Sequence, residues 1–537
     1  MPNPPLSLPL RYPLPTAAIL AVLILFPGIW EATGLTGKDE FFLGLRTPME
    51  MIAGDHWLVP FLDGAPRIKK PPLLYWLGRA SFEIFGPSLT SARAIAVLFA
   101  ALLAVATAAI GRRLADARTG LIAAGVLLGC LGLHTEGRRL MLDVPVAAFS
   151  ACAFWALLVW RERGHWRWLS LATLLLAAGF LTKGPVVLLL AGSGVLAFAL
   201  TRQWPVAELR GHWRALLAHA VLFMALALPW FILVRLLYPE ATQLAFADEV
   251  ESRQFLTLSP EMLAGLFNIG LPWMFVGIAA AWHLRREEGL RRALLLWFAA
   301  SALPFLFLKS FDRYLIGSLL PLSLFVAIAL PRLAARWPFR LGMVVALLFG
   351  GALAVFTFHF GLGGWPWLIA PALYLAWAWW QPRRLAHLLA APALYAAALL
   401  AGVFPALGIN AVPESVIELG RQRAVVFFHG PQPALLPILS ARPHRLQALK
   451  PADLPALAEK RALVFCEDAL APELARIATA AGYRTAPAGE YRALASHGSG
   501  LRFARTGAGR DDWLAAWRSR DLTPLTTRIV WFEIVRP

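Results

Sequence analysis

Long apolar runs alternate with short polar segments over the first three quarters of the chain, and each run predicts a membrane-spanning helix. Several runs are shorter than the roughly 20 residues that a helix needs to cross a bilayer, so their ends must extend into flanking residues. We predict about thirteen spans. They cover residues 14–35, 94–110, 120–133, 144–160, 166–181, 185–200, 215–237, 266–284, 293–308, 314–330, 341–360, 365–380 and 388–407.

Basic residues between the runs predict the orientation of the spans. If the N-terminus is cytoplasmic, every short loop that falls inside is rich in arginine, as the positive-inside rule requires. The outer loops are mixed in sign and richer in acids. All lysines before residue 450 also fall there, against the topology rule, so we expect them to serve something other than insertion. These lysines are Lys38, Lys69, Lys70, Lys183 and Lys309.

The hydropathy falls after about residue 410. Short apolar runs at 424–428 and 462–466 predict buried strands, and 451–459 and 471–481 predict helices. We therefore predict a transmembrane domain over 1–409, whose first outer loop is 36–91, and a small α/β domain over 410–537. The odd number of predicted spans places the second domain outside.

The composition supports a membrane protein and argues against other classes. The chain is 59% hydrophobic, with a mean hydropathy of +0.62, whereas soluble domains are usually about 45–50% apolar. The net charge of +18 comes from arginine clusters between apolar runs and not from one basic patch, so we predict no nucleic-acid partner. The three cysteines have no motif spacing, so neither a zinc cluster nor a disulfide framework is predicted.

Carboxylates and cations recur in the first outer loop. Asp39 and Glu40 follow the first span, where a carboxylate can accept a proton from a hydroxyl or orient a polar group. The alternative is the solvated start of a loop. Lys69 and Lys70 precede two prolines, and positive charge on such a stiff segment suits a phosphate. The alternative is an anchor to lipid headgroups.

Further charges occur at the outer ends of later spans. Asp143 begins a span, and Lys183 lies in a tight turn where an unpaired lysine is costly. Lys183 could instead snorkel to the headgroups. A charged segment ending near Arg253 covers the outer mouth or is a plain solvated face, and Lys309 and Tyr314 flank another outer turn. Together these groups suit an acid/base residue beside a phosphate clamp.

The order of these motifs resembles one family, the bacterial lipid A aminoarabinose transferases with their protein O-mannosyltransferase relatives. The resemblance runs along most of the first 330 residues. It implies the GT-C fold, which has a bundle of spanning helices, a large first periplasmic loop with interfacial helices and a C-terminal soluble domain. The motifs are Asp39-Glu40, residues 54–60 (GDHWLVP), Lys70-Pro71, Tyr75-Trp76, Leu142-Asp143, Thr182-Lys183-Gly184, Pro229-Trp230, Arg253 with Phe255, residues 271–273 (LPW) and Lys309 with Tyr314.

The resemblance implies an inverting sugar transfer from undecaprenyl phosphate on the outer leaflet of the bacterial inner membrane. The acceptor would be a lipid or cell-envelope glycan, with lipid A as one candidate. By motif position, Asp39 would be the catalytic carboxylate, and Lys70 would hold the donor phosphate. The predicted catalytic pair is Asp39 and Glu40, and the predicted substrate-binding set is Lys69, Lys70, Asp143, Lys183, Arg253, Lys309 and Tyr314.

The chain also departs from the aminoarabinose transferases. Ile68 and Lys69 replace an aromatic and an acidic residue, and Phe42 replaces an arginine. The extra cation at Lys69 favours an anionic donor or acceptor over aminoarabinose. A histidine that the family places in 248–255, implicated in metal binding, is absent, so we predict no metal site and no cofactor and leave dependence on a divalent metal open.

Three alternatives to this function remain. The first is a protein O-mannosyltransferase-like enzyme. The second is a transporter or flippase, but transporters usually place charges near the membrane midplane and show repeats, and the chain has neither pattern. The third is a non-catalytic membrane scaffold, which the departures from the family motifs leave open.

Overall fold

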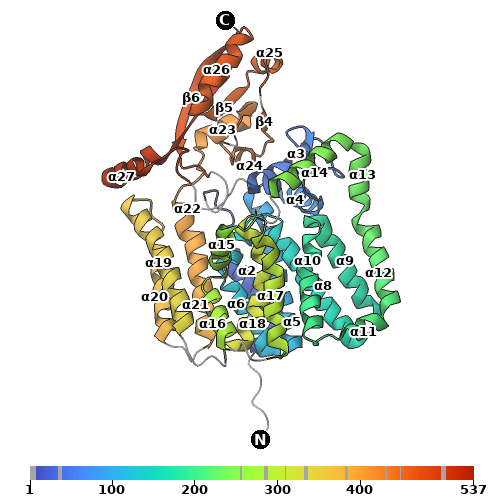
Figure 1. The fold of residues 1–537 in the computed structure, drawn as a ribbon. Coiled ribbons are helices and arrows are strands. Elements are labelled where there is room, and N and C mark those ends of the chain that lie inside the picture. Colours follow the sequence, from blue (N-terminus) through green and yellow to red (C-terminus); the bar gives the residue numbers. More distant parts are fainter. Residues whose placement is uncertain are drawn as a thin grey trace.

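The structure is a computed structural model that describes residues 8–33, 39–253, 257–283, 288–308, 310–331, 337–380, 385–430, 432–447, 449–496 and 503–536. A bundle of helices forms the larger part, and a small unit built on a sheet stands at one end of it (Figure 1). The N-terminus leaves the bundle at the opposite end, and the C-terminus lies at the tip of the small unit.

A helix lies over every predicted apolar run. Among the described residues, six helices are long and apolar enough to cross a membrane, or seven if one bent pair counts as a span, and further apolar helices are shorter. The protein is a multi-pass membrane protein, and the count of about thirteen spans stays a prediction. The helices are α2 (Pro13–Leu25), α5 (Leu89–Leu114), α6 (Ala117–Leu128), α8 (Asp143–Arg163), α9 (Trp166–Lys183), α10 (Val186–Leu200), α12 (Trp213–Ala227) with α13 (Pro229–Leu237), α15 (Pro260–Gly270) with α16 (Trp273–His283), α17 (Leu290–Leu306), η2 (Asp312–Ser318) with α18 (Leu319–Ala329), α19 (Trp337–His359), α20 (Pro366–Trp380) and α21 (Leu385–Ala398).

The prediction of one continuous span over 266–284 is wrong, because α15 and α16 meet at an angle of 102°. Pro272 lacks an N–H and disfavours helical geometry at the preceding residue, and Leu271 is extended, with φ −60° and ψ 140°. The N–H of Leu131 donates to the freed carbonyl of Leu271 at 2.9 Å. A neighbouring segment thus satisfies the backbone at the break, as a non-aqueous surrounding requires.

The first outer loop forms short elements at the end of the bundle that carries the sheet (Figure 1). They are η1 (Glu40–Arg46), α3 (Thr47–Ala53), a hairpin of β1 (Phe61–Leu62) and β2 (Ala65–Pro66), and α4 (Leu73–Phe85). The helix α14 (Pro239–Arg253) lies at the same end, whereas α11 (Val206–Gly211), from a loop predicted inside, lies at the other. The segments predicted outside therefore gather on one side of the bundle.

The sheet has five strands in the order β4-β3-β5-β7-β6. β4, β3 and β5 are parallel, while β7 runs antiparallel to β5 and β6. Residues alternate between its faces, so Val425 and Phe427 join one apolar cluster and Val426 and Phe428 the other. The bounds are β3 (Val425–Phe428), β4 (Arg445–Gln447), β5 (Leu463–Glu467), β6 (Arg484–Ala493) and β7 (Thr527–Val535), with α23 (Glu414–Gln422), α24 (Leu436–Ser440), α25 (Leu454–Glu459), α26 (Ala471–Ala480) and α27 (Arg510–Ser519).

β3 and β5 are the two strands expected from the sequence, and α25 and α26 lie within the two expected helices. β4, β6, β7, α23, α24 and α27 were not predicted. The first outer loop packs on this unit, because Phe41 and Met49 share an apolar cluster with Leu435 and Ile438. The boundary between 409 and 410 stays a prediction.

Candidate active site

Four charged side chains from distant parts of the sequence meet at the outer end of the bundle. Arg313 on η2 donates through Nη2 to Asp39 Oδ2, and its Nε lies 3.5 Å from Asp143 Oδ2. Lys183 Nζ donates to Asp143 Oδ1. We call these four residues the central cluster. Its two cations and two carboxylates balance in charge, which is what a buried group of ions requires.

Exposure distinguishes the members of the central cluster. The side chains of Asp143, Lys183 and Arg313 are 3%, 6% and 7% exposed, whereas that of Asp39 is 38% exposed. Asp39 is therefore the member that a substrate can reach, and Arg313 fixes the direction of its carboxylate.

Local structure explains why Asp143 and Lys183 face each other. Asp143 is the first residue of α8 and Lys183 the last residue of α9. A helix dipole favours a carboxylate at its start and a cation at its end. Gly184, with φ +63°, then turns the chain back into α10, a conformation that favours glycine. The predicted tight turn is present, but Lys183 itself is the last helical residue before it.

Aromatic rings complete the wall beside the two buried cations. Lys183 Nζ lies 3.4 Å from the centroid of the Tyr314 ring, and the guanidinium of Arg313 lies 4.2 Å from the centroid of Phe311. Such cation–π contacts stabilise charges that have lost their water. The structure thus brings the predicted residues Asp39, Asp143, Lys183 and Tyr314 together.

Glu40 has a different environment from its neighbour Asp39. Its side chain is fully buried, and Arg93 donates to both of its oxygens at 3.1 Å. The N–H of Leu140 donates to it at 3.2 Å, and Arg93 also donates to the carbonyls of Ile29 and Glu31. Because a catalytic carboxylate must reach the substrate, these contacts argue against the predicted catalytic role. Glu40 instead ties the first loop to α5 and to the loop before α8.

The lysine pair forms a second charged group, with α14. Lys69 donates to Asp248, and Lys70 Nζ lies 3.0 Å from each carboxylate oxygen of Glu249. The lysine side chains are 43% and 19% exposed. Two acidic residues of α14 therefore occupy the positions at which an anion would meet the predicted phosphate clamp.

The side chains of two predicted substrate-binding residues are not described. Arg253 is the last residue of α14, but its side chain is not described. Lys309 lies outside the described residues. No group of three or more His, Cys, Asp or Glu side chains suited to a metal ion is present in the part of the chain that the structure describes.

The predicted site left out two outer-loop residues, Arg313 and Glu136. Glu136 is buried 2.9 Å from Arg139, and burial raises the pKa of its carboxyl although Arg139 and Arg313 oppose this. Arg313 carried a usable signal, because it is an arginine in an outer loop, against the topology rule. Its neighbours Lys309 and Tyr314 were selected instead.

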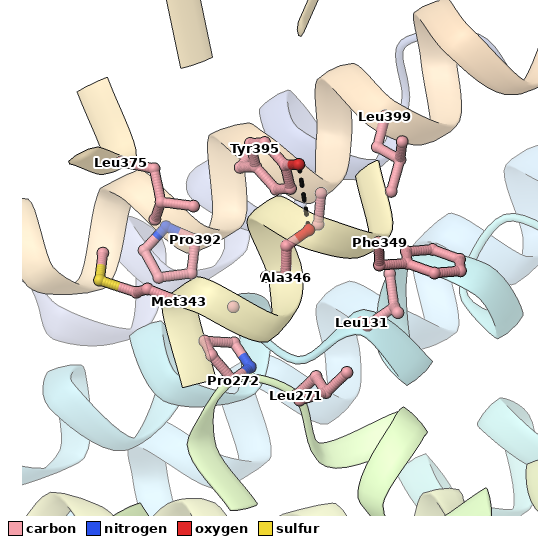
Figure 2. A pocket seen from close by; sticks show the side chains of 12 residues that line it. Leu131, Leu271, Pro272, Met343, Ala346, Phe349, Leu375, Pro392, Tyr395 and Leu399 are labelled. Carbon is pink, nitrogen blue, oxygen red and sulfur yellow. Dashed lines mark hydrogen bonds between the residues drawn. The ribbon is translucent and has the colours of Figure 1, made fainter. Parts of the chain in front are cut away.

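A separate cavity lies between α19, α20, α21 and the break before α16 (Figure 2). It is about 20 Å³ in size and almost entirely apolar, with residues such as Leu131, Met343 and Leu375 in its wall. The hydroxyl of Tyr395 points to its rim and donates to the carbonyl of Ala346 at 3.1 Å. The cavity shares no lining residue with the central cluster and offers no charged group for catalysis.

Comparison with known proteins finds similar glycosyltransferases. Residues 69–233 match a family model described as dolichyl-phosphate-mannose-protein mannosyltransferase. The chain is 29% identical over 367 residues to undecaprenyl phosphate-alpha-4-amino-4-deoxy-L-arabinose arabinosyl transferase 1 of Sodalis glossinidius. It is 25% identical over 293 residues to the transferase of that name from Shewanella sediminis. These matches cover 61% and 52% of this chain, and the chain spans 63% and 52% of the length of these relatives.

A solved structure with similarity over nearly the whole chain gives the fold. It is the crystal structure of ArnT from Cupriavidus metallidurans bound to undecaprenyl phosphate, with a TM-score of 0.68, 18% sequence identity and coverage of 96% of this chain and 97% of that one. The chain has the GT-C fold. The resemblance to the aminoarabinose transferases and their mannosyltransferase relatives is confirmed. In this chain the first outer loop and α14 lie at one end of the helix bundle (Figure 1).

Proposed function

We propose that the protein is a membrane glycosyltransferase that moves a sugar from undecaprenyl phosphate to a lipid or glycan acceptor at the periplasmic face of the inner membrane. The observation that carries the proposal is the central cluster, in which one accessible carboxylate, Asp39, is held by a buried arginine. Relatives named as undecaprenyl-phosphate arabinosyl transferases support the donor class. Lipid A is one candidate acceptor.

Asp39 takes the acid/base role in this proposal. It accepts the proton of the acceptor hydroxyl as the acceptor oxygen bonds to C1 of the sugar, and the bond from C1 to the phosphate oxygen breaks with its electron pair on the phosphate. Arg313 orients Asp39 toward the incoming hydroxyl, and Asp143 with Lys183 fixes Arg313 in turn. A general base of this kind contributes about 10²–10⁴-fold to the rate.

The leaving phosphate gains negative charge as the glycosidic bond breaks, so cations beside it stabilise the transition state more than the ground state. Lys69 and Lys70 take this role. The phosphate must displace Asp248 and Glu249 from the lysines before it can bind. Displacing the two acidic side chains costs little free energy, because the ion pairs are partly exposed and such pairs contribute about 0.2–1 kcal/mol.

A protein O-mannosyltransferase-like activity is the second candidate. It is favoured by the description of the family model that matches residues 69–233. The chemistry at Asp39 would be the same, because both reactions attack a polyprenyl-phosphate sugar with a hydroxyl. Only the acceptor distinguishes the two candidates.

The test is a transfer assay with the purified full chain in proteoliposomes that contain undecaprenyl-phosphate sugars and extracted envelope acceptors. Asp39→Asn should lower the release of undecaprenyl phosphate about 10²–10⁴-fold. Asp55→Asn is the matched control, since Asp55 belongs to the same loop, its side chain is 90% exposed and it pairs with Arg79 outside the cluster. Equal activity of wild type and Asp39→Asn would refute the role of Asp39. Transport of intact donor without release would favour a flippase.

A further inference from the structure

A basic groove lies where α2, α5 and α8 meet, far from the central cluster. Its volume is about 470 Å³. The helix α8 connects the two places, since it has 21 residues, begins at Asp143 and ends at Arg163. At 1.5 Å per residue this is about 30 Å, the thickness of the hydrocarbon core of a bilayer. The groove therefore lies at the membrane surface opposite the candidate active site.

The groove carries excess positive charge. Arg112, Arg113 and Arg163 line it together with Glu162, so three cations face one carboxylate, a net charge of two. Glu162 pairs with Arg113. Arg112 and Arg163 are exposed, and no carboxylate among the described residues forms an ion pair with either. Two arginines thus remain available to an anion.

An adjoining hollow makes the contrast clear. It shares Arg113 and Glu162 with the groove, but its further charges are Arg161 and Glu208, which pair at 2.9 Å. Two cations and two carboxylates cancel there. An anion at this membrane surface would therefore enter the groove and not the hollow.

The other wall of the groove is apolar. Leu14, Ala109 and Trp155 form it, and the guanidinium of Arg113 lies 5.9 Å from the centroid of the Trp155 ring. Cations beside an apolar wall at a membrane surface match a ligand with an anionic head and hydrocarbon chains. A soluble anion would leave the apolar wall without a contact.

We propose that this groove binds an anionic glycerophospholipid of the cytoplasmic leaflet, with its phosphate between Arg112 and Arg163 and its acyl chains along Leu14 and Trp155. The arginines could serve only as topology signals, but that role needs no groove and no preference among lipids. The inference does not depend on glycosyl transfer.

The experiment is native mass spectrometry of the purified full chain, titrated in detergent with phosphatidylglycerol or phosphatidylcholine. We expect one tightly bound phosphatidylglycerol and much weaker phosphatidylcholine. The double variant Arg112→Gln/Arg163→Gln should weaken phosphatidylglycerol binding roughly 30-fold, since each basic residue near an anionic surface contributes about a factor of five. Arg118→Gln is the control, because Arg118 is exposed at the same surface on α6 and does not line the groove.

The proposal is overturned by the absence of a preference for phosphatidylglycerol, by unchanged binding in the double variant, or by an equal loss in Arg118→Gln. Displacement of the lipid by millimolar inorganic phosphate would identify a soluble-anion site instead. If the glutamine variants fail to insert, Arg112→Lys/Arg163→Lys keeps the topology charges. It should still weaken binding severalfold, because lysine cannot grip a phosphate with a bidentate fork, and unchanged binding in that variant would contradict the assignment.

Discussion

The pair of Asp143 and Lys183 gives a quantitative test of the central cluster. Asp143→Asn removes the carboxylate that pairs with both Lys183 and Arg313, so that of the two carboxylates in the central cluster only Asp39 remains. Breaking a buried ion pair from one side costs about 3–5 kcal/mol, because an uncompensated charge stays buried. Lys183→Met leaves the opposite charge uncompensated, so we expect a similar loss.

The double variant Asp143→Asn/Lys183→Met should lose little more than either single variant. Arg313 and Asp39 still balance each other in it, because the two substitutions together remove one carboxylate and one ammonium group. The free energy of unfolding would be measured in mixed micelles for all four proteins. We expect a coupling of about 3 kcal/mol, at the upper end of values for residues in contact.

The matched control is Glu208→Gln at the opposite end of the bundle. Arg161 and Glu208 are also an ion pair, but their side chains are 30% and 35% exposed, so the loss should stay near or below about 1 kcal/mol. Additive losses in the double variant, or single losses as small as this control, would refute a charge-balanced buried cluster.

Three further predictions follow from the outer end of the molecule. Asp248→Asn and Glu249→Gln should each tighten equilibrium binding of undecaprenyl phosphate by about 1.4–5-fold, because each removes a competing ion pair, and weaker binding would mean that the acids help to hold the donor. Glu40→Gln should lower the free energy of unfolding by about 3 kcal/mol, because it removes the carboxylate that compensates the buried charge of Arg93. A stable but inactive variant would restore Glu40 to catalysis. Burial lowers the pKa of His444 to about 4, whereas the pKa of an unfolded histidine is about 6.5. The neutral side chain therefore contributes fully to the free energy of unfolding above pH 6.5, and this contribution should be lost as the pH falls from 6.5 through 4. Unfolding of wild type and His444→Gln measured between pH 7 and 4 should show a flatter curve in the variant.

The helical bundle could be predicted from the sequence because hydropathy alone specifies where lipid-facing helices occur. Pro272 is a sequence signal for the break between α15 and α16, but hydropathy averaged over a window does not detect a single proline. In the sheet, β3 and β5 could be predicted because each is a short apolar run. The edge strand β6 carries charged and half-exposed residues with a bulge near Gly489, so its identity depends on pairing with β7.

The sequence predicted individual residues of the site, but it did not predict which of them contact one another. Asp39 and Arg313 are 274 positions apart, and nothing local indicates that they meet. Asp39 and Glu40 could not be distinguished either. Consecutive residues of a helix point in different directions, so one carboxylate reaches the surface and the other is buried against Arg93. Only the packing around η1 decides which is which.

The central claim is that Asp39 serves the transfer of a sugar to an envelope acceptor. Mass spectrometry of envelope lipids and glycans tests it most directly, in cells that make the wild-type protein, Asp39→Asn or no protein. We expect a sugar-sized mass difference on one acceptor with the wild type alone, at equal protein levels. Identical profiles in all three strains, with undecaprenyl-phosphate sugar shown to be present, would contradict the account.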